Sequence, residues 1–129
     1  MRLWIATLGV LLGGPALGQG HPCDAAYTQV EMTECSREGW ELADKALNRA
    51  YDAAIQGARE FDEWPRGRAE ETLRAAQRAW VPFRDAACEA EAATWEGGTG
   101  QAMVQYGCLE RLTVQRTDDL LAYAEQWGG

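Results

Sequence analysis

The chain has 129 residues and a formal net charge of −8, from 20 acidic and 12 basic residues. This length suits a single domain, and the acidic balance argues against a nucleic-acid-binding class, which needs a basic surface. The chain has one histidine, His21, and one serine, Ser36, so it lacks the material for a Ser-His-Asp triad or a zinc site of several ligands. We therefore assign no catalytic residue, no metal ligand and no cofactor.

Residues 1–18 have the organisation of a secretory signal peptide. Arg2 supplies the positive charge, residues 3–12 form an apolar run too short to span a bilayer, and small residues precede the expected cleavage site. The mature chain would begin at Gln19 with a charge of −9, since removing Arg2 leaves 11 basic residues against 20 acidic ones. We expect a periplasmic or secreted protein with one domain, residues 19–129, and no membrane anchor after cleavage.

The first helix is predicted to begin at a capping box, in which Thr28 and Glu31 each satisfy a backbone N–H of the first turn. Small and apolar residues then recur at a spacing near 3.6 until the pattern fades around Phe61. These residues are Trp40, Ala43, Leu47, Ala50, Tyr51 and Ala54. The connection that follows, residues 62–67, contains Pro65, which is well placed to open the next helix.

Two further amphipathic helices follow. The apolar residues expected to line them are Leu73, Ala76, Trp80, Phe83 and Ala87 in the second, and Leu109, Leu112, Leu120 and Tyr123 in the third. Pro82 predicts a kink in the second helix, and the glycine-rich segment 97–100 separates it from the third, at about 102–126. Abundant alanine and scarce valine and isoleucine also favour helices. We predict an all-α fold, an antiparallel up-down-up three-helix bundle.

Four cysteines, Cys23, Cys35, Cys88 and Cys108, predict two disulfides in an exported chain. Facing residues of an antiparallel helix pair have numbers that sum to a constant. Cys88 and Cys108 each lie ten residues from Gly98, the centre of the second connection, so they should face each other. This favours Cys88–Cys108 with Cys23–Cys35. The alternative, Cys35–Cys88 with Cys23–Cys108, misses the register of the first connection by about 7 Å along a helix axis.

A seam of polar residues is expected between the helices. The register about Trp64 sets Asp44 opposite Arg84 on positions that face the core. The predicted network consists of Asp44, Asn48, Gln77, Arg84 and Arg116. We interpret it as structural, with Asp44 and Arg84 as a largely buried ion pair, rather than as a catalytic centre. An arginine partner would keep Asp44 ionised and therefore unsuited to general-acid catalysis.

Three ordered motifs extend over most of the chain. The first motif is Cys23…Gln29-Val30-Glu31-Met32-Thr33-Glu34-Cys35 followed by Asp44-x-x-Leu47-Asn48-x-x-Tyr51. The second motif is Gln77-Arg78-Ala79-Trp80-x-x-Phe83-Arg84-Asp85-x-x-Cys88. The third motif is Gly97-Gly98…Cys108-Leu109…Leu112-Thr113-x-x-Arg116…Leu120. Together they cover about residues 22–123 and resemble the LprI-type lysozyme-inhibitor domain family. The resemblance implies a small, exported, helical protein with cysteines, in a family named for a member that inhibits lysozyme.

The resemblance implies a binding protein rather than an enzyme. Its partner would be a protein, with a cationic lysozyme as the candidate, because opposite charge speeds encounter with a chain of charge −9. The alternative is a periplasmic interaction module for another envelope protein, without activity against lysozyme. A glycosidase needs only two carboxylates, but we disfavour it because a small three-helix bundle leaves little room for a substrate cleft.

The loop between the second and third helices is the predicted binding element. A lysozyme cleft holds two carboxylates, so an acidic helix face laid over it would meet like charge. A loop with few charges is a better plug: its glycines allow close backbone approach, and its tryptophan offers an apolar anchor. The predicted partner-binding residues are Trp95, Glu96, Gly97, Gly98 and Thr99. The alternative interpretation is that this segment only connects two helices.

Overall fold

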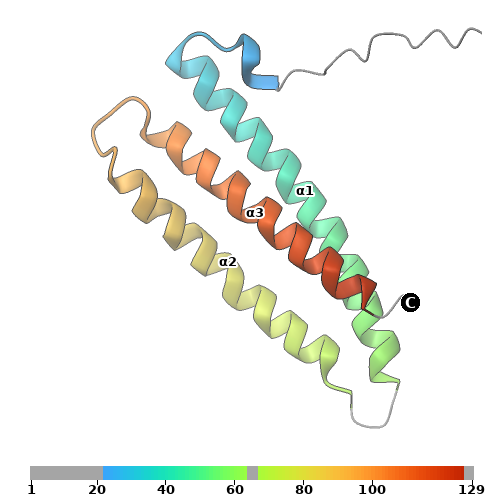
Figure 1. The fold of residues 1–129 in the computed structure, drawn as a ribbon. Coiled ribbons are helices and arrows are strands. Elements are labelled where there is room, and N and C mark those ends of the chain that lie inside the picture. The colour runs from blue at the N-terminus through green and yellow to red at the C-terminus, as the bar shows by residue number, and fades with distance from the viewer. Residues whose placement is uncertain (1–21, 64–66, 127–129) are drawn as a thin grey trace, which may run out of the picture.

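A computed structural model of the chain describes residues 22–63 and 67–126. The elements are a 3-10 turn, η1 (Pro22–Ala25), and three helices, α1 (Gln29–Asp62), α2 (Ala69–Ala93) and α3 (Gln101–Glu125). Consecutive helices run in opposite directions, and no strand occurs in these ranges (Figure 1). The predicted antiparallel up-down-up bundle is confirmed. The signal peptide expected at 1–18, and Trp64 and Pro65 of the first connection, lie outside the described residues.

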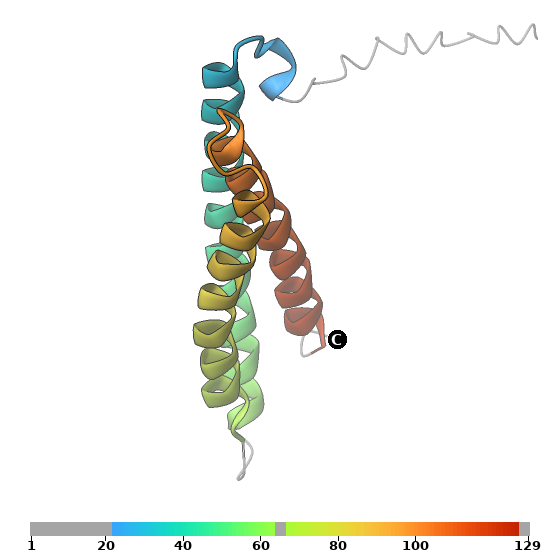
Figure 2. The same ribbon diagram turned by 90° about the vertical axis from the view of Figure 1, so that its left-hand side faces the viewer.

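The third helix holds the bundle together. In the side view, the axes of α1 and α2 are nearly parallel and the two helices overlap, whereas α3 is inclined to both (Figure 2). Most of the contacts that α3 makes are with α1 rather than α2. Alanines contribute to this packing because Ala50, Ala54 and Ala58 of α1 are buried and leave room for close approach of a neighbouring helix.

The core has two parts along the bundle. Towards the α1–α2 connection it is aliphatic, and it consists of Leu47, Ala50, Ala54, Ile55, Ala58, Leu73 and Leu120. Towards the α2–α3 connection it is built around the bonded pair Cys88 and Cys108 together with Leu109, flanked by Trp40 and Tyr106. The second part contains little aliphatic surface, so the disulfide and aromatic packing carry more of the stability at that end.

Both predicted disulfides are present. Cys23–Cys35 joins η1 to α1 with a Cα–Cα distance of 5.5 Å, and Cys88–Cys108 joins α2 to α3 at 5.4 Å. Both distances lie within the range that a disulfide spans without backbone movement. The pairing by equal distance from Gly98 is therefore confirmed, and the alternative pairing is excluded.

The start of α1 follows the predicted capping box. The backbone N–H of Glu31 donates to Oγ1 of Thr28 at 3.2 Å, and the N–H of Thr28 donates to Oε2 of Glu31 at 2.9 Å. The N–H of Tyr27 also donates to the same carboxylate oxygen, at 3.0 Å. These hydrogen bonds lower the pKa of the Glu31 carboxyl group, and the bond from the Thr28 N–H has the largest effect. Backbone N–H groups at the start of α1 therefore find acceptors in the side chains of both Thr28 and Glu31.

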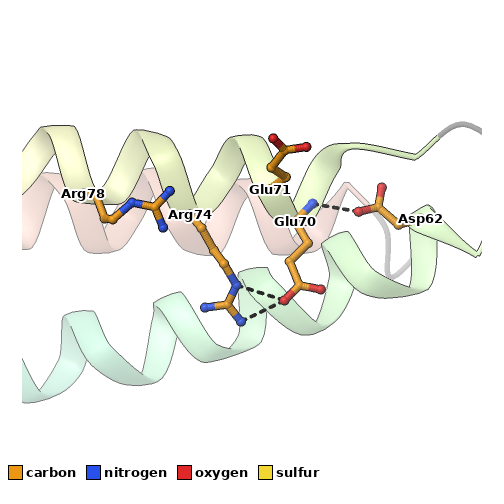
Figure 3. Close-up of a pocket in the computed structure, with 5 residues that line it drawn as sticks. All are labelled: Asp62, Glu70, Glu71, Arg74 and Arg78. Atoms are coloured by element: carbon orange, nitrogen blue, oxygen red, sulfur yellow. Dashed lines mark hydrogen bonds and ion pairs between the residues drawn. The ribbon is translucent and has the colours of Figure 1, made fainter.

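The start of α2 differs from the sequence-based prediction, because the helix begins at Ala69 and not at Pro65. Asp62, the last residue of α1, caps it across the chain reversal. Its carboxylate accepts from the N–H of Ala69 at 2.8 Å and of Glu70 at 2.9 Å (Figure 3). A Cβ on Gly67 would lie 2.2 Å from the Asp62 Cα, so only glycine permits this approach.

The buried face of α2 differs from the predicted apolar stripe at two positions, because Ala76 is exposed and Phe83 is 63% exposed. Arg84 is buried, as its predicted place facing the core requires. The buried residues of this helix are Leu73, Arg84, Cys88 and Ala92. The bond to Cys108 fixes the rotation of α2 about its axis, which turns Arg84 inwards and its neighbour Phe83 outwards. Pro82 lies on the exposed side, and the helix continues through it.

Candidate partner-binding site

The loop at residues 94–100 lies at one end of the bundle, beside the start of α1 (Figure 1). Its backbone forms a defined turn: the N–H of Trp95 donates to the carbonyl of Ala92, and the N–H of Gly98 donates to the carbonyl of Trp95, both at 2.9 Å. Gly97 adopts a φ of +80°, which is readily accessible to glycine alone. The turn therefore requires glycine at its tip.

Trp95 is held on one side and open on the other. A Cβ added to Gly100 would lie 3.5 Å from Cε3 of the indole, so the ring packs directly against this buried glycine. The rest of the side chain faces outwards, and Trp95 is 53% exposed. The five residues predicted to bind a partner, Trp95, Glu96, Gly97, Gly98 and Thr99, are all exposed on this loop. The loop thus presents an aromatic ring on a fixed turn.

The base of the loop is fixed by links between all three helices. Cys88–Cys108 joins the two helices that flank the loop. Arg111 and Glu91 form an ion pair at 2.7 Å across the same helices. Nε2 of Gln29 in α1 lies 3.6 Å from Sδ of Met103 in α3. Because the frame is already ordered, little conformational entropy would be lost when the loop binds.

Arg84, which is only 6% exposed, lies farther along α2 from the loop than Cys88 does. Nε and one terminal nitrogen of Arg84 bond Oδ1 of Asp85 at 2.9 and 2.8 Å. The other terminal nitrogen lies 3.4 Å from both Oδ1 of Asp44 and Oγ1 of Thr113. Since these groups come from α1, α2 and α3, one cation connects all three helices.

Tryptophan rings lie against the guanidinium groups of the buried Arg84 and the half-buried Arg116. The guanidinium carbon of Arg84 lies 5.2 Å from the ring centre of Trp80 and 5.9 Å from that of Trp40. Arg116 lies 6.0 Å from Trp80 and donates from Nε to Oε1 of Gln77 at 3.0 Å. Cation–π contacts of this kind gain strength when the cation is desolvated. The cluster therefore fixes the register of the bundle.

Two features of the predicted network are wrong. The Asp44 side chain is 42% exposed, so its pair with Arg84 is not largely buried. Asn48 is exposed and makes no hydrogen bond or ion pair within residues 22–63 and 67–126. The cause is the setting of α1, which points Ala43 and Leu47 at the core instead.

Sequence reasoning also missed partners of Arg84. Asp85 is adjacent in the chain, where two residues of a helix normally do not face each other, and Thr113 lies on another helix. The sequence signal that could have identified Thr113 as a partner of Arg84 was its place next to Leu112 in the third motif. The groups of this cluster are engaged with one another, which fits a structural role and not a catalytic one.

The fold and the site define a class: a small helical bundle, braced by disulfides, that presents a rigid aromatic loop at one end. Among the described helices, none is long and apolar enough to cross a membrane.

Comparison with known proteins names the family. The model of the family "Lysozyme inhibitor LprI" matches residues 23–120, and the chain belongs to this family. A similar protein, the uncharacterized protein R02472 of Rhizobium meliloti (strain 1021), is 32% identical over 104 residues, which cover 76% of this chain and 75% of the relative. No solved structure matches the chain. The matched range contains both disulfides, the Arg84 cluster and the loop.

Proposed function

We propose that this protein is an exported inhibitor that binds lysozyme and blocks its substrate cleft with the loop at residues 94–100. Membership of the LprI family supports the class of partner. The observation that carries the choice of surface is the exposed ring of Trp95, fixed against Gly100 on a turn braced by a disulfide. The protein acts by binding and contributes no catalytic group.

The composition of the loop suits a cleft that contains carboxylates. Glu96 is the single charged residue in the segment, and Gly97 and Gly98 present bare backbone next to the ring of Trp95. Bare backbone can approach a concave surface closely. A large, rigid aromatic side chain that fills a pocket is a typical source of binding energy at protein interfaces.

The charge of the protein suits a cationic partner. The chain carries a formal charge of −8, and −9 if Arg2 is removed with the leader. Glu89 is exposed on α2 near the loop and makes no ion pair among the described residues. Charges around the rim of an interface speed association and contribute less to the lifetime of the complex. Raising the salt concentration should therefore slow association more than it speeds release.

Export is part of the proposal. Residues 1–18 act as the signal peptide, and the mature domain, residues 19–129, works in the periplasm or outside the cell. The two disulfides support this location, because such bonds persist in oxidising compartments.

The direct test measures the turnover of a cationic lysozyme on cell walls, with and without the protein purified from the periplasm of an expressing bacterium. The proposal requires inhibition that saturates with one protein per lysozyme. Unchanged turnover at protein concentrations far above that of the enzyme would refute it, and would favour an interaction module for another envelope protein. Lysis of cell walls by the protein alone would instead identify an enzyme.

A further inference from the structure

A groove of about 290 Å³ lies between α1 and α3, and no residue of the loop at 94–100 lines it. Its floor is apolar and includes Gly39, Leu42, Val114 and the Cys23–Cys35 disulfide. Leu42 is 60% exposed, and Val114 is also exposed. Glu38 and Glu110 complete the lining. The groove therefore combines exposed aliphatic side chains with two carboxylates.

The position of Glu110 depends on Gly39, a glycine inside the first half of α1. A Cβ added to Gly39 would lie 2.7 Å from Oε2 and 3.0 Å from Cδ of Glu110. The carboxylate thus lies directly over the backbone of α1, in space that any other residue at position 39 would occupy. Glycine is unfavourable inside a helix, so its use here matches the close approach of this acidic group.

The two groove carboxylates have no counter-charge. Neither Glu38 nor Glu110 forms an ion pair or hydrogen bond with any other described residue, although Glu110 is half-buried. On a neighbouring part of α1, by contrast, Arg37 bonds both Glu34 and Glu41. A half-buried carboxylate without a partner is electrostatically costly, and a cation placed in the groove would relieve that cost.

The surface next to the groove, along α1, is also both acidic and apolar. A second hollow of about 410 Å³ shares Cys35 and Glu38 with the groove, and it extends over Val30 to the carboxylates of Glu31 and Glu34. Val30 is exposed. The joined surface is long enough to receive an extended or helical segment and not just one side chain.

We infer that the α1–α3 groove binds a basic amphipathic segment of a protein partner. An apolar side chain of the segment enters between Leu42 and Val114, and flanking lysine or arginine residues pair with Glu38 and Glu110. A second copy of this chain is a poor occupant, because it would bring the same uncompensated carboxylates against each other. The inference goes beyond lysozyme inhibition, since the groove shares no residue with the loop at 94–100.

The probe is a synthetic amphipathic helical peptide of lysine, leucine and alanine, titrated into the exported protein and followed by calorimetry at low salt. Two matched peptides serve as controls, one with glutamate in place of lysine and one with serine in place of leucine. We expect binding of the first peptide only, because the groove needs both a cation and an apolar anchor.

Substitutions in the groove test whether the peptide binds there. Glu110→Gln and Leu42→Gln should each weaken binding at least tenfold, about 1.4 kcal/mol. The matched controls lie on α2: Glu89→Gln removes the same charge, and Phe83→Gln removes a side chain that is similarly exposed, at 63%. These controls should bind the peptide as the parent does. Gly39→Ala must push the end of the Glu110 side chain aside and should also weaken binding, while the helical circular dichroism stays unchanged.

Three results would overturn the inference: no binding of the basic peptide, an equal loss in the α2 controls, or sedimentation showing a dimer that Leu42→Gln dissociates. The test is independent of the lysozyme assay. Trp95→Ala should leave peptide binding unchanged, and a protein that fails to inhibit lysozyme can still bind the peptide through the groove.

Discussion

The two ends of the bundle close their helical hairpins by different chemistry. At the α2–α3 end, a covalent bond joins Cys88 to Cys108 below the turn at Gly97. At the α1–α2 end, Asp62 caps α2 and Glu70 receives hydrogen bonds from Arg74 at 2.8 and 2.9 Å (Figure 3).

A further ion pair joins the helices at the α1–α2 end, where Nε of Arg59 lies 2.9 Å from Oε2 of Glu70. Charge-assisted links of this kind on an exposed surface weaken with salt and with acid, whereas a disulfide is insensitive to both. The end that carries the proposed binding loop should therefore keep its geometry when the salt concentration or the pH changes.

Among the changes considered, loss of the Cys88–Cys108 bond should lower the free energy of unfolding most. The double variant Cys88→Ala/Cys108→Ala should lose about 2–4 kcal/mol in the free energy of unfolding, because the bond closes a loop of 20 residues between two helices. Denaturant unfolding measures this loss. The matched control removes Cys23–Cys35, which ties only η1 to α1 and should cost less. A larger loss in the control would contradict the importance assigned to the α2–α3 end.

Arg84→Ala should cost about 2–3 kcal/mol, since it removes charged hydrogen bonds to three groups and the contacts with two tryptophans. Asp44→Ala should cost only about 1 kcal/mol, because Asp44 is half-exposed and Asp85 still pairs with Arg84. Thermal and denaturant unfolding of both variants give the comparison. Equal losses would mean that Asp44, and not the whole cluster, holds the arginine in place.

At the opposite end, Asp62→Ala should cost about 1 kcal/mol, the usual effect of removing an N-cap side chain. Two backbone N–H groups at the start of α2 lose their acceptor in this variant. Asp52→Ala is the matched control, because Asp52 is exposed on the same helix and makes no hydrogen bond or ion pair among the described residues. Unfolding curves that coincide for the two variants would show that the cap is replaced by water.

The smallest expected effect is a dependence of the stability on pH, which arises at the α1–α2 end. Hydrogen bonds from Arg59 and then Arg74 lower the pKa of the Glu70 carboxyl group. A lowered pKa in the folded state gives stability that is present above the unfolded pKa, about 4.3, and is lost as the pH falls through the folded pKa. Melting temperatures of the parent and of Glu70→Gln should therefore differ at neutral pH and converge as the pH falls below about 4.3 and through the lowered pKa of Glu70. A constant difference would contradict the linkage.

Much of the fold could be predicted from the sequence, because the relevant signals are local or symmetric. The capping box at Thr28 needs only four consecutive residues, and the Cys88–Cys108 pairing follows from equal distances to Gly98. The cap from Asp62 could not be predicted in this way. It reaches α2 across a chain reversal, and no fixed spacing identifies it.

The apolar stripe of α2 was mispredicted for a related reason. Hydrophobicity placed Phe83 at the core, although the register of the polar seam already set Arg84 there. The position of Cys88 sets the rotation of the helix, which turns Arg84 inwards, and two tryptophans cover the buried cation. The loop residues at 94–100 were identified by their glycines. The α1–α3 groove gave no sequence signal, because Gly39 and Glu110 belong to different helices.

The most direct test of the proposed function compares Trp95→Ala with Phe83→Ala in lysozyme inhibition on cell walls. Both side chains are aromatic and more than half exposed, but only Trp95 lies on the braced loop. We predict that Trp95→Ala raises the inhibition constant at least tenfold, about 1.4 kcal/mol, while Phe83→Ala inhibits as the parent does and both variants stay folded. A folded Trp95→Ala variant with unchanged inhibition would contradict the assignment of the loop as the binding element.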